Sequence, residues 1–195
     1  MGRPQTAGYS LLELTFVSAL IATMGGIAMP QAMAALDEFR AAGAARYISA
    51  RLYRTRMEAV MRSTPVAIQF SQSAGGYRYS VFLDGNGSGV LTSDIRAGID
   101  PPLGVAESLR DNFKGIDFGA LPGLPAIDPG GTPPGDDPIR LGAGSLLTFT
   151  AHGSSSTGTV YIRGRDAQYA VRVFGDTGKS RVLKFHPRTR RWRAA

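Results

Sequence analysis

An apolar stretch near the start of the chain constrains the fold more than any other feature of the sequence. It reads GYSLLELTFVSALIATMGGIAMP, and between Tyr9 and Met29 it carries a single charged residue, Glu13. As an α-helix rising about 1.5 Å per residue, this run extends about 30 Å, which is the thickness of the hydrocarbon core of a bilayer. We therefore expect a helix that can span a membrane.

Two other kinds of N-terminal segment fit the sequence less well. A cleaved secretory signal has an apolar core of about 7 to 15 residues followed by an A-x-A-like site. Here the apolar run is longer, and no such site follows it before the charged stretch at Asp37. The first residues, MGRPQT, match the short myristoylation pattern M-G-x-x-x-[ST], but a spanning segment directly behind them disfavours lipidation.

The carboxylate of Glu13 needs a partner, because a charged side chain at the centre of a bilayer costs about 2.5 to 3.5 kcal/mol. Glu13 lies four residues after Tyr9. Cleavage between Gly8 and Tyr9 would create a positively charged amine one helical turn from this carboxylate, in the same chain or in a neighbouring one. The spacing thus indicates a salt bridge that forms only after processing.

The run from Gly8 to Leu14, the short leader before it and Pro30 at the far end of the apolar helix resemble the N-terminus of type IV prepilins, which type IV pilins and type II secretion pseudopilins share. The resemblance implies that a prepilin peptidase cleaves after Gly8 and N-methylates Tyr9, which replaces the more usual Phe. It also implies that Glu13 is needed for methylation and neutralises the terminal amine of an adjacent subunit. Other pilins or pseudopilins of the filament and an inner-membrane assembly platform would be the partners.

After Pro30 a helical pattern continues to about residue 62, with apolar and small residues returning on one face at intervals of three, four and once seven. This pattern predicts that residues 30–62 form an amphipathic continuation of the helix, which packs on a globular head. With Gly25 and Gly26 before it, Pro30 also predicts a bend or local weakness around residues 25–30. The face predicted to contact the head consists of Leu36, Phe39, Gly43, Tyr47, Ala50, Met57 and Met61.

From residue 63 the periodicity shifts towards two, which is typical of strands. Residues 98–144 interrupt this pattern, carry eight of the 12 prolines and are expected to form an irregular insertion. The fold class predicted is α+β and pilin-like, with a long N-terminal helix packed on an antiparallel β-sheet head at residues 63–186. The first expected strands are PVAIQFS and GYRYSVFLD, and the last four, expected to form one antiparallel sheet, are SLLTFT, GTVYIRG, QYAVRVFG and SRVLKF.

The later strands carry a second resemblance. LTFTAHGSSSTGTVYIRG and YAVRVFGDTGKSRVLKF are similar to the C-terminal half of the GspH/FimT family of pseudopilins and minor pilins, in which a T-G-[RK]-x-R-V turn and strand recur. The two resemblances cover about residues 5–72 and 145–186. They imply a GspH-like minor pseudopilin of the type II secretion system, a structural subunit of the periplasmic pseudopilus. The alternative is a FimT-like minor pilin of a type IV pilus that binds DNA for uptake.

Under either interpretation residues 1–8 are a leader and residues 9–29 a single-pass anchor in the bacterial inner membrane, with the C-terminal head in the periplasm. The net charge of +7 comes from the C-terminal end, since seven basic residues and no acidic one follow Gly178. Gly178–Arg181 resembles the G-R-x-R motif implicated in DNA uptake by FimT-like pilins, and the residues 187–195 form a basic tail. This tail could also be solvated or contact an acidic partner subunit. The candidate DNA-binding residues are Lys179, Arg181, Lys184, Arg188, Arg190, Arg191 and Arg193.

No other motif indicates a catalytic or metal site. The chain has no cysteine, which excludes disulfides, Cys-ligated zinc and thiol nucleophiles. In DGNGSGVLTSDI, Asp84, Asn86 and Ser88 match ligand positions of a calcium loop, but Ile95 replaces the final acidic ligand, so a hairpin turn is favoured over a weak calcium site. His152 and His186 lie near no recognisable catalytic group. We therefore expect neither an enzyme nor a cofactor.

Overall fold

The computed structural model describes residues 9–195 of the chain. The predicted leader, residues 1–8 with the cleavage-site residue Gly8, lies outside the described residues. By its internal contacts the chain divides after Leu36 into two compact units, and helix α1, Leu11–Arg62, continues from one into the other. Residues 9–36 are called the apolar segment here, and residues 37–195 the head.

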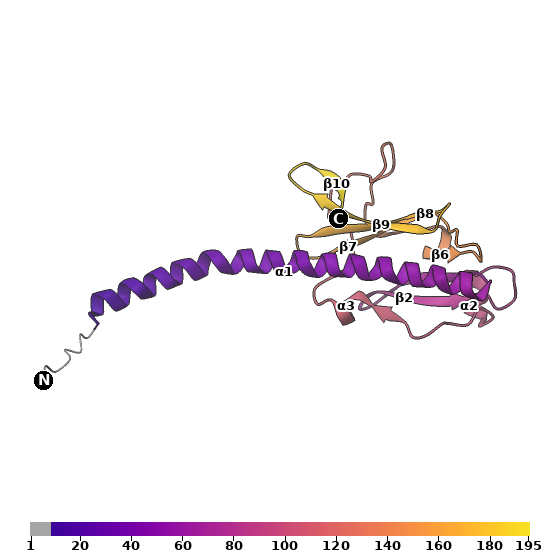
Figure 1. The fold of residues 1–195 in the computed structure, drawn as a ribbon, viewed down its shortest axis with the longest axis horizontal. Helices are drawn as coiled ribbons and strands as arrows, with labels where there is room; N and C mark the ends of the chain where they lie inside the picture. Colours follow the sequence, from indigo (N-terminus) through magenta and orange to yellow (C-terminus); the bar gives the residue numbers. More distant parts are fainter. Residues whose placement is uncertain (1–8) are drawn as a thin grey trace, which may run out of the picture. The chain divides into compact units, whose positions relative to one another are not determined.

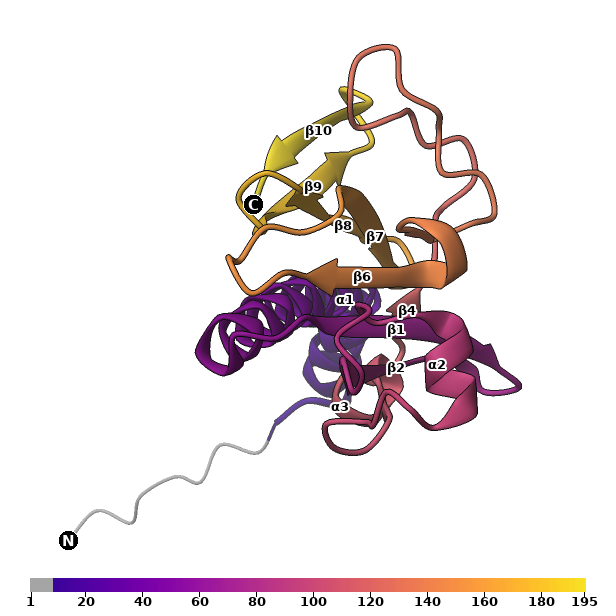
Figure 2. The same cartoon turned by 90° about the vertical axis from the view of Figure 1, so that its right-hand side faces the viewer.

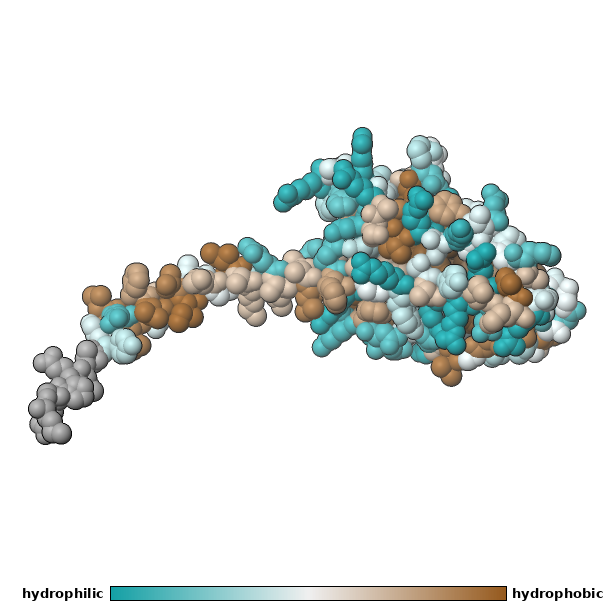
Figure 3. Space-filling model, in the orientation of Figure 1, coloured by the Kyte–Doolittle hydropathy of each residue, from teal (hydrophilic) through white to brown (hydrophobic). Residues whose placement is uncertain are grey.

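The apolar segment is helical, and its large apolar side chains are exposed from Tyr9 to Met33 (Figure 3). It is long and apolar enough to cross a membrane. Three of its hydroxyl groups donate to main-chain carbonyls of the same helix: Thr15 to Leu12 (2.9 Å), Ser18 to Leu14 (2.7 Å) and Thr23 to Ala19 (2.5 Å). These internal bonds make the hydroxyl groups compatible with an apolar surrounding.

Pro30 lies inside α1, at the far end of the apolar run. The predicted bend or weakness does not take the form of a break, because residues 25–30 all remain helical. The helix therefore continues through this region into the head.

Two antiparallel sheets and the second half of α1 make up the head (Figure 1, Figure 2). Sheet A has the order β3-β2-β1-β6 and is built from β1 Val66–Ser73, β2 Gly76–Leu83, β3 Glu107–Ser108 and β6 Leu146–Phe149. Sheet B has the order β10-β9-β8-β7-β4, with β5 also paired to β7. Its strands are β4 Asp117–Phe118, β5 Ile139–Arg140, β7 Gly158–Arg163, β8 Gln168–Phe174, β9 Lys179–His186 and β10 Arg191–Ala194.

Short helical elements lie in the connections between strands: α2 Thr92–Ala97, α3 Leu109–Asn112 and the 3-10 turn Ala143–Ser145. The predicted α+β class, a long N-terminal helix packed on antiparallel sheets, is confirmed.

The last four predicted strands exist, but they do not form one sheet. β6 pairs with β1 in sheet A, with Val66 opposite Phe149 and Gln69 opposite Leu146. Strands β7, β8 and β9 pair with one another in sheet B. Two of the three apolar residues of β6, Leu147 and Phe149, are fully buried, and a strand next to β1 brings them into the core shared by the two sheets. The prediction, which followed the order of the strands in the sequence, therefore assigned β6 to the wrong sheet.

The helix face that packs on the head differs from the predicted face. Of the predicted residues, Phe39 is 75% exposed and Met61 67% exposed, Ala50 is exposed, and Leu36 belongs to the apolar segment. Small side chains dominate the buried face, which lets the helix backbone approach the sheets closely. The buried residues of α1 are Ala41, Ala44, Ala45, Ile48, Leu52, Thr55 and Ala59.

Two residues of the predicted face do contact the head. Tyr47 is half-buried and its ring packs on Phe113, with 5.7 Å between centroids. Gly43 lies over the same ring, where an added Cβ would come within 3.1 Å of it. The prediction of this face is thus right at Gly43 and Tyr47 and wrong at Phe39, Ala50 and Met61.

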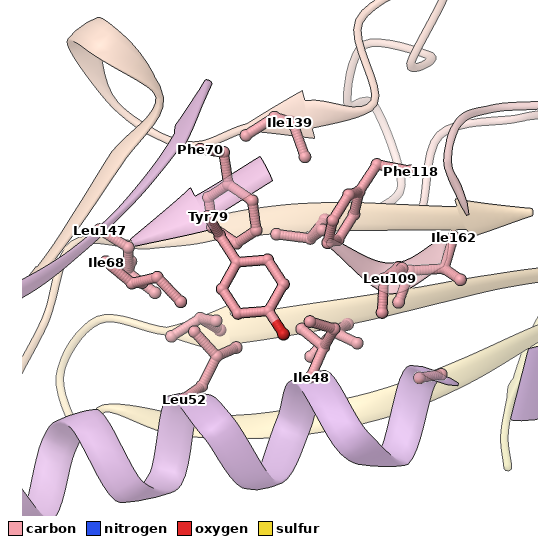
Figure 4. Packing of buried hydrophobic residues seen from close by; sticks show 14 of the residues in the cluster. Ile48, Leu52, Ile68, Phe70, Tyr79, Leu109, Phe118, Ile139, Leu147 and Ile162 are labelled. Carbon is pink, nitrogen blue, oxygen red and sulfur yellow. The ribbon is translucent and has the colours of Figure 1, made fainter. Parts of the chain in front are cut away.

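The core lies between α1 and the inner faces of both sheets (Figure 4). Ile48 and Leu52 of the helix pack beside Tyr79, whose hydroxyl points towards the helix. This hydroxyl donates to Glu107 (3.0 Å), which also accepts from Tyr47 (2.7 Å) and pairs with Arg51. Glu107 thus has three donors, which satisfy its carboxylate at this edge of the core.

The Pro-rich segment 98–144 contributes more to the fold than an irregular insertion would. It supplies β3, β4 and β5 to the two sheets, and Leu109, Ile116 and Phe118 to the shared core. Its irregular part is confined mainly to residues 119–138. The segment is therefore an integral part of the head.

Candidate assembly and interaction surfaces

The N-terminal candidates lie in the first turns of the apolar segment. Ser10 caps α1 by accepting from the main-chain N–H of Leu12 (3.3 Å), and Glu13 lies in the first helical turn. Tyr9 is 87% exposed. Within residues 9–195, Glu13 has no hydrogen-bond or ion-pair partner. The geometry leaves its carboxylate available to a group from outside these residues.

The expected basic tail is part of sheet B. β10 pairs with β9 in register, with Arg191 opposite His186 and Ala194 opposite Leu183. A tight turn joins the two strands, and Arg190 adopts a left-handed φ of 50° there. Residues 187–195 thus form the second arm of a hairpin, and sequence reasoning missed this because basic residues conceal the strand pattern.

Trp192 anchors this hairpin to the Pro-rich segment. Its indole N–H donates to the carbonyl of Pro125 (3.0 Å), and its ring packs on Tyr161 and Phe185, with centroids 5.8 and 5.3 Å away. Next to it, Arg190 donates to the carbonyl of Gly123 (3.1 Å). Because the ring is held between the sheet and this segment, Trp192 is a packing residue and does not provide a free stacking surface.

The basic candidates therefore fall into two groups. Lys184 is half-buried and pairs with Glu38 of α1 (2.6 Å), and Glu38 also accepts from the hydroxyl of Tyr169. Burial first, and then the contact with Glu38, raise the pKa of Tyr169. The other candidates are exposed: Lys179, Arg181, Arg188, Arg190, Arg191 and Arg193.

Two of these exposed cations lie together beside the turn between β8 and β9. Gly178 occupies this turn with a left-handed φ of 60°, and Lys179 follows it. Arg181 stacks on Phe174, 5.7 Å from the ring centroid, and so presents its guanidinium at the outer face of sheet B. The structure thus brings Lys179 and Arg181 close together and places Lys184 on the opposite, helix-facing side.

The weak calcium candidates form a hydrogen-bonded turn. The carboxylate of Asp84 accepts from the main-chain N–H groups of Asn86 (3.1 Å), Gly87 (2.7 Å) and Gly89 (2.8 Å). Asn86 and Ser88 both donate to the carboxylate of Asp94 (3.0 and 3.2 Å). These bonds occupy the oxygens that a calcium ion would need. The segment is thus a turn, but it leads from β2 into helix α2, so the hairpin expected from the sequence is not formed.

Comparisons with known proteins place this chain among pilin-like subunits. A family model described as "Type II transport protein GspH" matches residues 44–178, more than half of the chain. The minor pseudopilin EpsH from the type 2 secretion system of Vibrio cholerae is similar in structure, with 15% identity, a TM-score of 0.46 and coverage of 74% of this chain and 97% of that chain.

The type IV minor pilin FimU of Pseudomonas aeruginosa strain PAO1 is also similar in structure, with 20% identity, a TM-score of 0.37 and coverage of 78% of this chain and 86% of that chain. The comparison with curated proteins gives no match. The residues matched by the family model begin in the part of α1 that packs on the head and end at Gly178, in the turn before β9. They include all strands of both sheets except β9 and β10.

Proposed function

The chain belongs to the GspH family, and on this basis we propose that it is a minor pseudopilin of a type II secretion system. It would be a structural subunit of the periplasmic pseudopilus, taking part in protein secretion across the outer membrane. The observation that carries this proposal is the family match over residues 44–178, which includes the core residues of both sheets.

The apolar segment supports assembly by its side chains, which are exposed on all faces of the helix from Tyr9 to Met33. Such a surface requires lipid before assembly and the helices of neighbouring subunits afterwards. We place residues 9–29 of the segment across the inner membrane as a single span, with the head in the periplasm. Pro30 would mark the far end of this span both in the membrane and in the assembled filament.

Processing completes this proposal. A prepilin peptidase would cleave after Gly8 and methylate the amine of Tyr9, and the carboxylate of Glu13 would neutralise the corresponding amine of an adjacent subunit. Glu13 has no partner within residues 9–195, which is consistent with a partner supplied by another chain. The remaining partners would be the other pseudopilins and the assembly platform in the inner membrane.

Deletion of the gene in the native bacterium tests the function. We expect enzymes normally secreted through the type II system to accumulate in the periplasm, and secretion to return with the wild-type gene. The mature protein, purified from native membranes and sequenced from its N-terminus, should begin at Tyr9. Normal secretion in the deletion strain, or a mature protein with another first residue, would contradict the corresponding part of the proposal.

The alternative, a FimT-like minor pilin that captures DNA, draws on the exposed pair Lys179 and Arg181. Gel shifts with the full chain in detergent, with and without Lys179→Ala plus Arg181→Ala, distinguish the two functions. DNA capture requires salt-sensitive binding that the double variant loses. The ring of Trp192 is packed within the head and so does not offer a free surface on which a base could stack, which favours the pseudopilin function. For a pseudopilin we expect no DNA binding at low salt.

A further inference from the structure

A groove of about 500 Å³ lies in the head between α1 and the beginning of β9. The helix and the strand run side by side in opposite directions (Figure 1). Glu38 pairs with Lys184 at one end, Ser49 and Ser180 share a hydrogen bond of 2.8 Å further along, and Gly178 lies at the other end. The groove opens beyond the pair of serines.

The groove is lined by cations. Arg46, Arg56 and Lys179 contribute to its wall, and its lining contains no acidic residue. Arg56 is fixed in place because its Nε donates to the carbonyl of Gly153 (2.8 Å). The side chain of Tyr53, which is 60% exposed, adds an aromatic surface. The groove therefore suits an acidic ligand that also has apolar parts.

The edge of β9 next to this groove is open in the described part of the chain. β10 pairs with β9 from Leu183 to His186, and the N–H of Ala195 donates to the carbonyl of Val182 (3.1 Å). Because successive residues of a strand direct their main-chain groups to alternate sides, the N–H and C=O of Ser180 point to the same side as those of Val182. Within residues 9–195 no strand pairs with that side at Ser180.

From these two observations we propose that the groove binds an extended acidic peptide segment of a partner protein. The segment adds to β9 as a strand at Ser180, exchanging main-chain hydrogen bonds with this edge. Acidic and apolar side chains on the face of the added strand that meets α1 contact Arg46 and Tyr53, and an acidic side chain on its other face contacts Lys179, so both faces carry acidic residues. A nucleic acid could meet the cations, but it lacks the regularly spaced amide groups that pair with a strand edge. The site lies in the head and goes beyond the proposed structural function.

Fluorescence anisotropy with a labelled eight-residue peptide of sequence EEVVEEVV, which presents Glu and Val on both faces of a strand, tests the proposal when the peptide is added to the full chain in neutral detergent micelles. We expect saturable binding that weakens at least about tenfold in Arg46→Glu and in Lys179→Glu. Arg54→Glu is the matched control, because Arg54 is exposed on the same helix but does not line the groove, and it should leave affinity unchanged. Thermal unfolding of each variant, followed by circular dichroism, shows whether the head is folded.

Two further probes separate strand addition from simple charge attraction. The same peptide with N-methyl groups on alternate amides keeps its charge but cannot pair with the edge, and it should bind at least about tenfold more weakly. A single-stranded oligonucleotide of 12 thymidines should neither bind at physiological salt nor displace the peptide. Equal binding of the methylated peptide, equal affinity in Arg46→Glu, no peptide binding, or displacement by the oligonucleotide would each overturn the proposal.

Discussion

Asp37, the first residue of the head, joins α1 to a turn far away in the sequence. Its carboxylate accepts from the main-chain N–H groups of Arg165 (2.9 Å), Asp166 (3.0 Å) and Ala167 (3.0 Å) in the turn between β7 and β8. Partial burial tends to raise the pKa of Asp37, but these three donors outweigh it and hold the pKa below its ordinary value of 3.8. Gly164 leaves room for this contact, because an added Cβ there would collide with the carboxylate.

We predict that Asp37→Ala lowers the free energy of unfolding of the head by about 1.5 to 3 kcal/mol at pH 7, the contribution typical of hydrogen bonds to a charged group. A lowered pKa in the folded state means that this stabilisation is complete above the ordinary pKa and is lost as the pH falls through the folded value. Urea unfolding followed by the fluorescence of Trp192, from pH 7 to pH 2.5, measures the difference. Asp176→Ala, at an exposed turn, is the control; a difference that does not shrink in acid would contradict the assignment.

The buried hydroxyl groups of Tyr79 and Tyr169 should make the head less stable at high pH. Both are almost fully buried, and burial is the main reason why the pKa of each hydroxyl lies above its ordinary value of 10. Because the folded-state pKa is raised, the stabilisation is complete below pH 10 and is lost as the pH rises towards the folded value. We expect the absorbance at 295 nm from these two residues to rise together with unfolding, measured by circular dichroism. In Tyr79→Phe and Tyr169→Phe, the part of the absorbance rise that accompanies unfolding should be smaller. Full ionisation of both tyrosines in a head that is still folded would disprove the prediction.

At the scale of the elements, periodicity predicted that α1 packs on the head but selected the wrong face. The pattern of large apolar residues pointed to Phe39 and Met61, both of which are exposed. The face in contact with both sheets is built from alanines, whose low hydrophobicity gives a weak signal, although their small size permits close packing. A sequence pattern reports which residues are apolar, but only the shape of the partner surface determines which apolar face fits.

The buried alanines of α1, Ala41, Ala44, Ala45 and Ala59, leave no room for a larger side chain, and this can be tested. We expect Ala45→Leu to destabilise the head by about 1 to 3 kcal/mol, because Ala45 is fully buried and the larger side chain would force the helix and sheets apart. Ala50→Leu introduces the same side chain at an exposed position and should change stability by less than about 0.5 kcal/mol. Chemical denaturation of both variants provides the comparison. Similar stabilities for the two would show that the helix does not pack through this face.

The Pro-rich segment and the C-terminal hairpin depend on each other, which neither sequence pattern indicated. The strands β1, β2, β7, β8 and β9 were predictable from their alternating residues, since each carries its own local signal. The contact between Trp192 and Pro125 joins two segments without periodicity, and only the folded chain brings them together. This is the physical reason why the hairpin was mistaken for a tail.

Removal of this contact should free residues 119–138, the irregular part of the Pro-rich segment, without unfolding the core. We predict that Trp192→Ala lowers stability by about 1 to 3 kcal/mol, less than the loss of a fully buried aromatic residue, and that proteases then cleave within residues 119–138. Arg193→Ala, its exposed neighbour on β10, should leave the cleavage pattern unchanged. Mass spectrometry of the fragments identifies the sites. Equal resistance of the two variants would mean that Trp192 does not anchor the segment.

At the scale of the whole molecule, the chain combines two units with opposite surface requirements. The head buries its apolar side chains in its own core, whereas the apolar segment exposes them and needs an external partner. The spacing of Tyr9 and Glu13 was readable from the sequence, because it requires only local geometry. Within residues 9–195 Glu13 contacts no partner, and we propose that the site is completed only in an assembly.

Because Glu13 lacks a partner in the described residues, we predict that its substitution affects assembly but not membrane insertion. Removing a charge from an apolar helix makes insertion easier, so Glu13→Ala should remain in the membrane fraction and be cleaved after Gly8 as in the wild type. Without the carboxylate, the amine of a neighbouring Tyr9 lacks a counter-ion in a medium of low dielectric constant, and we expect incorporation into the filament and secretion to be lost. Cell fractionation, N-terminal sequencing and a secretion assay measure insertion, cleavage and secretion separately, and cross-linking of subunits in the membrane measures incorporation. Ser18→Ala, in the same segment, should behave as wild type, and normal secretion by Glu13→Ala would refute the role of this carboxylate.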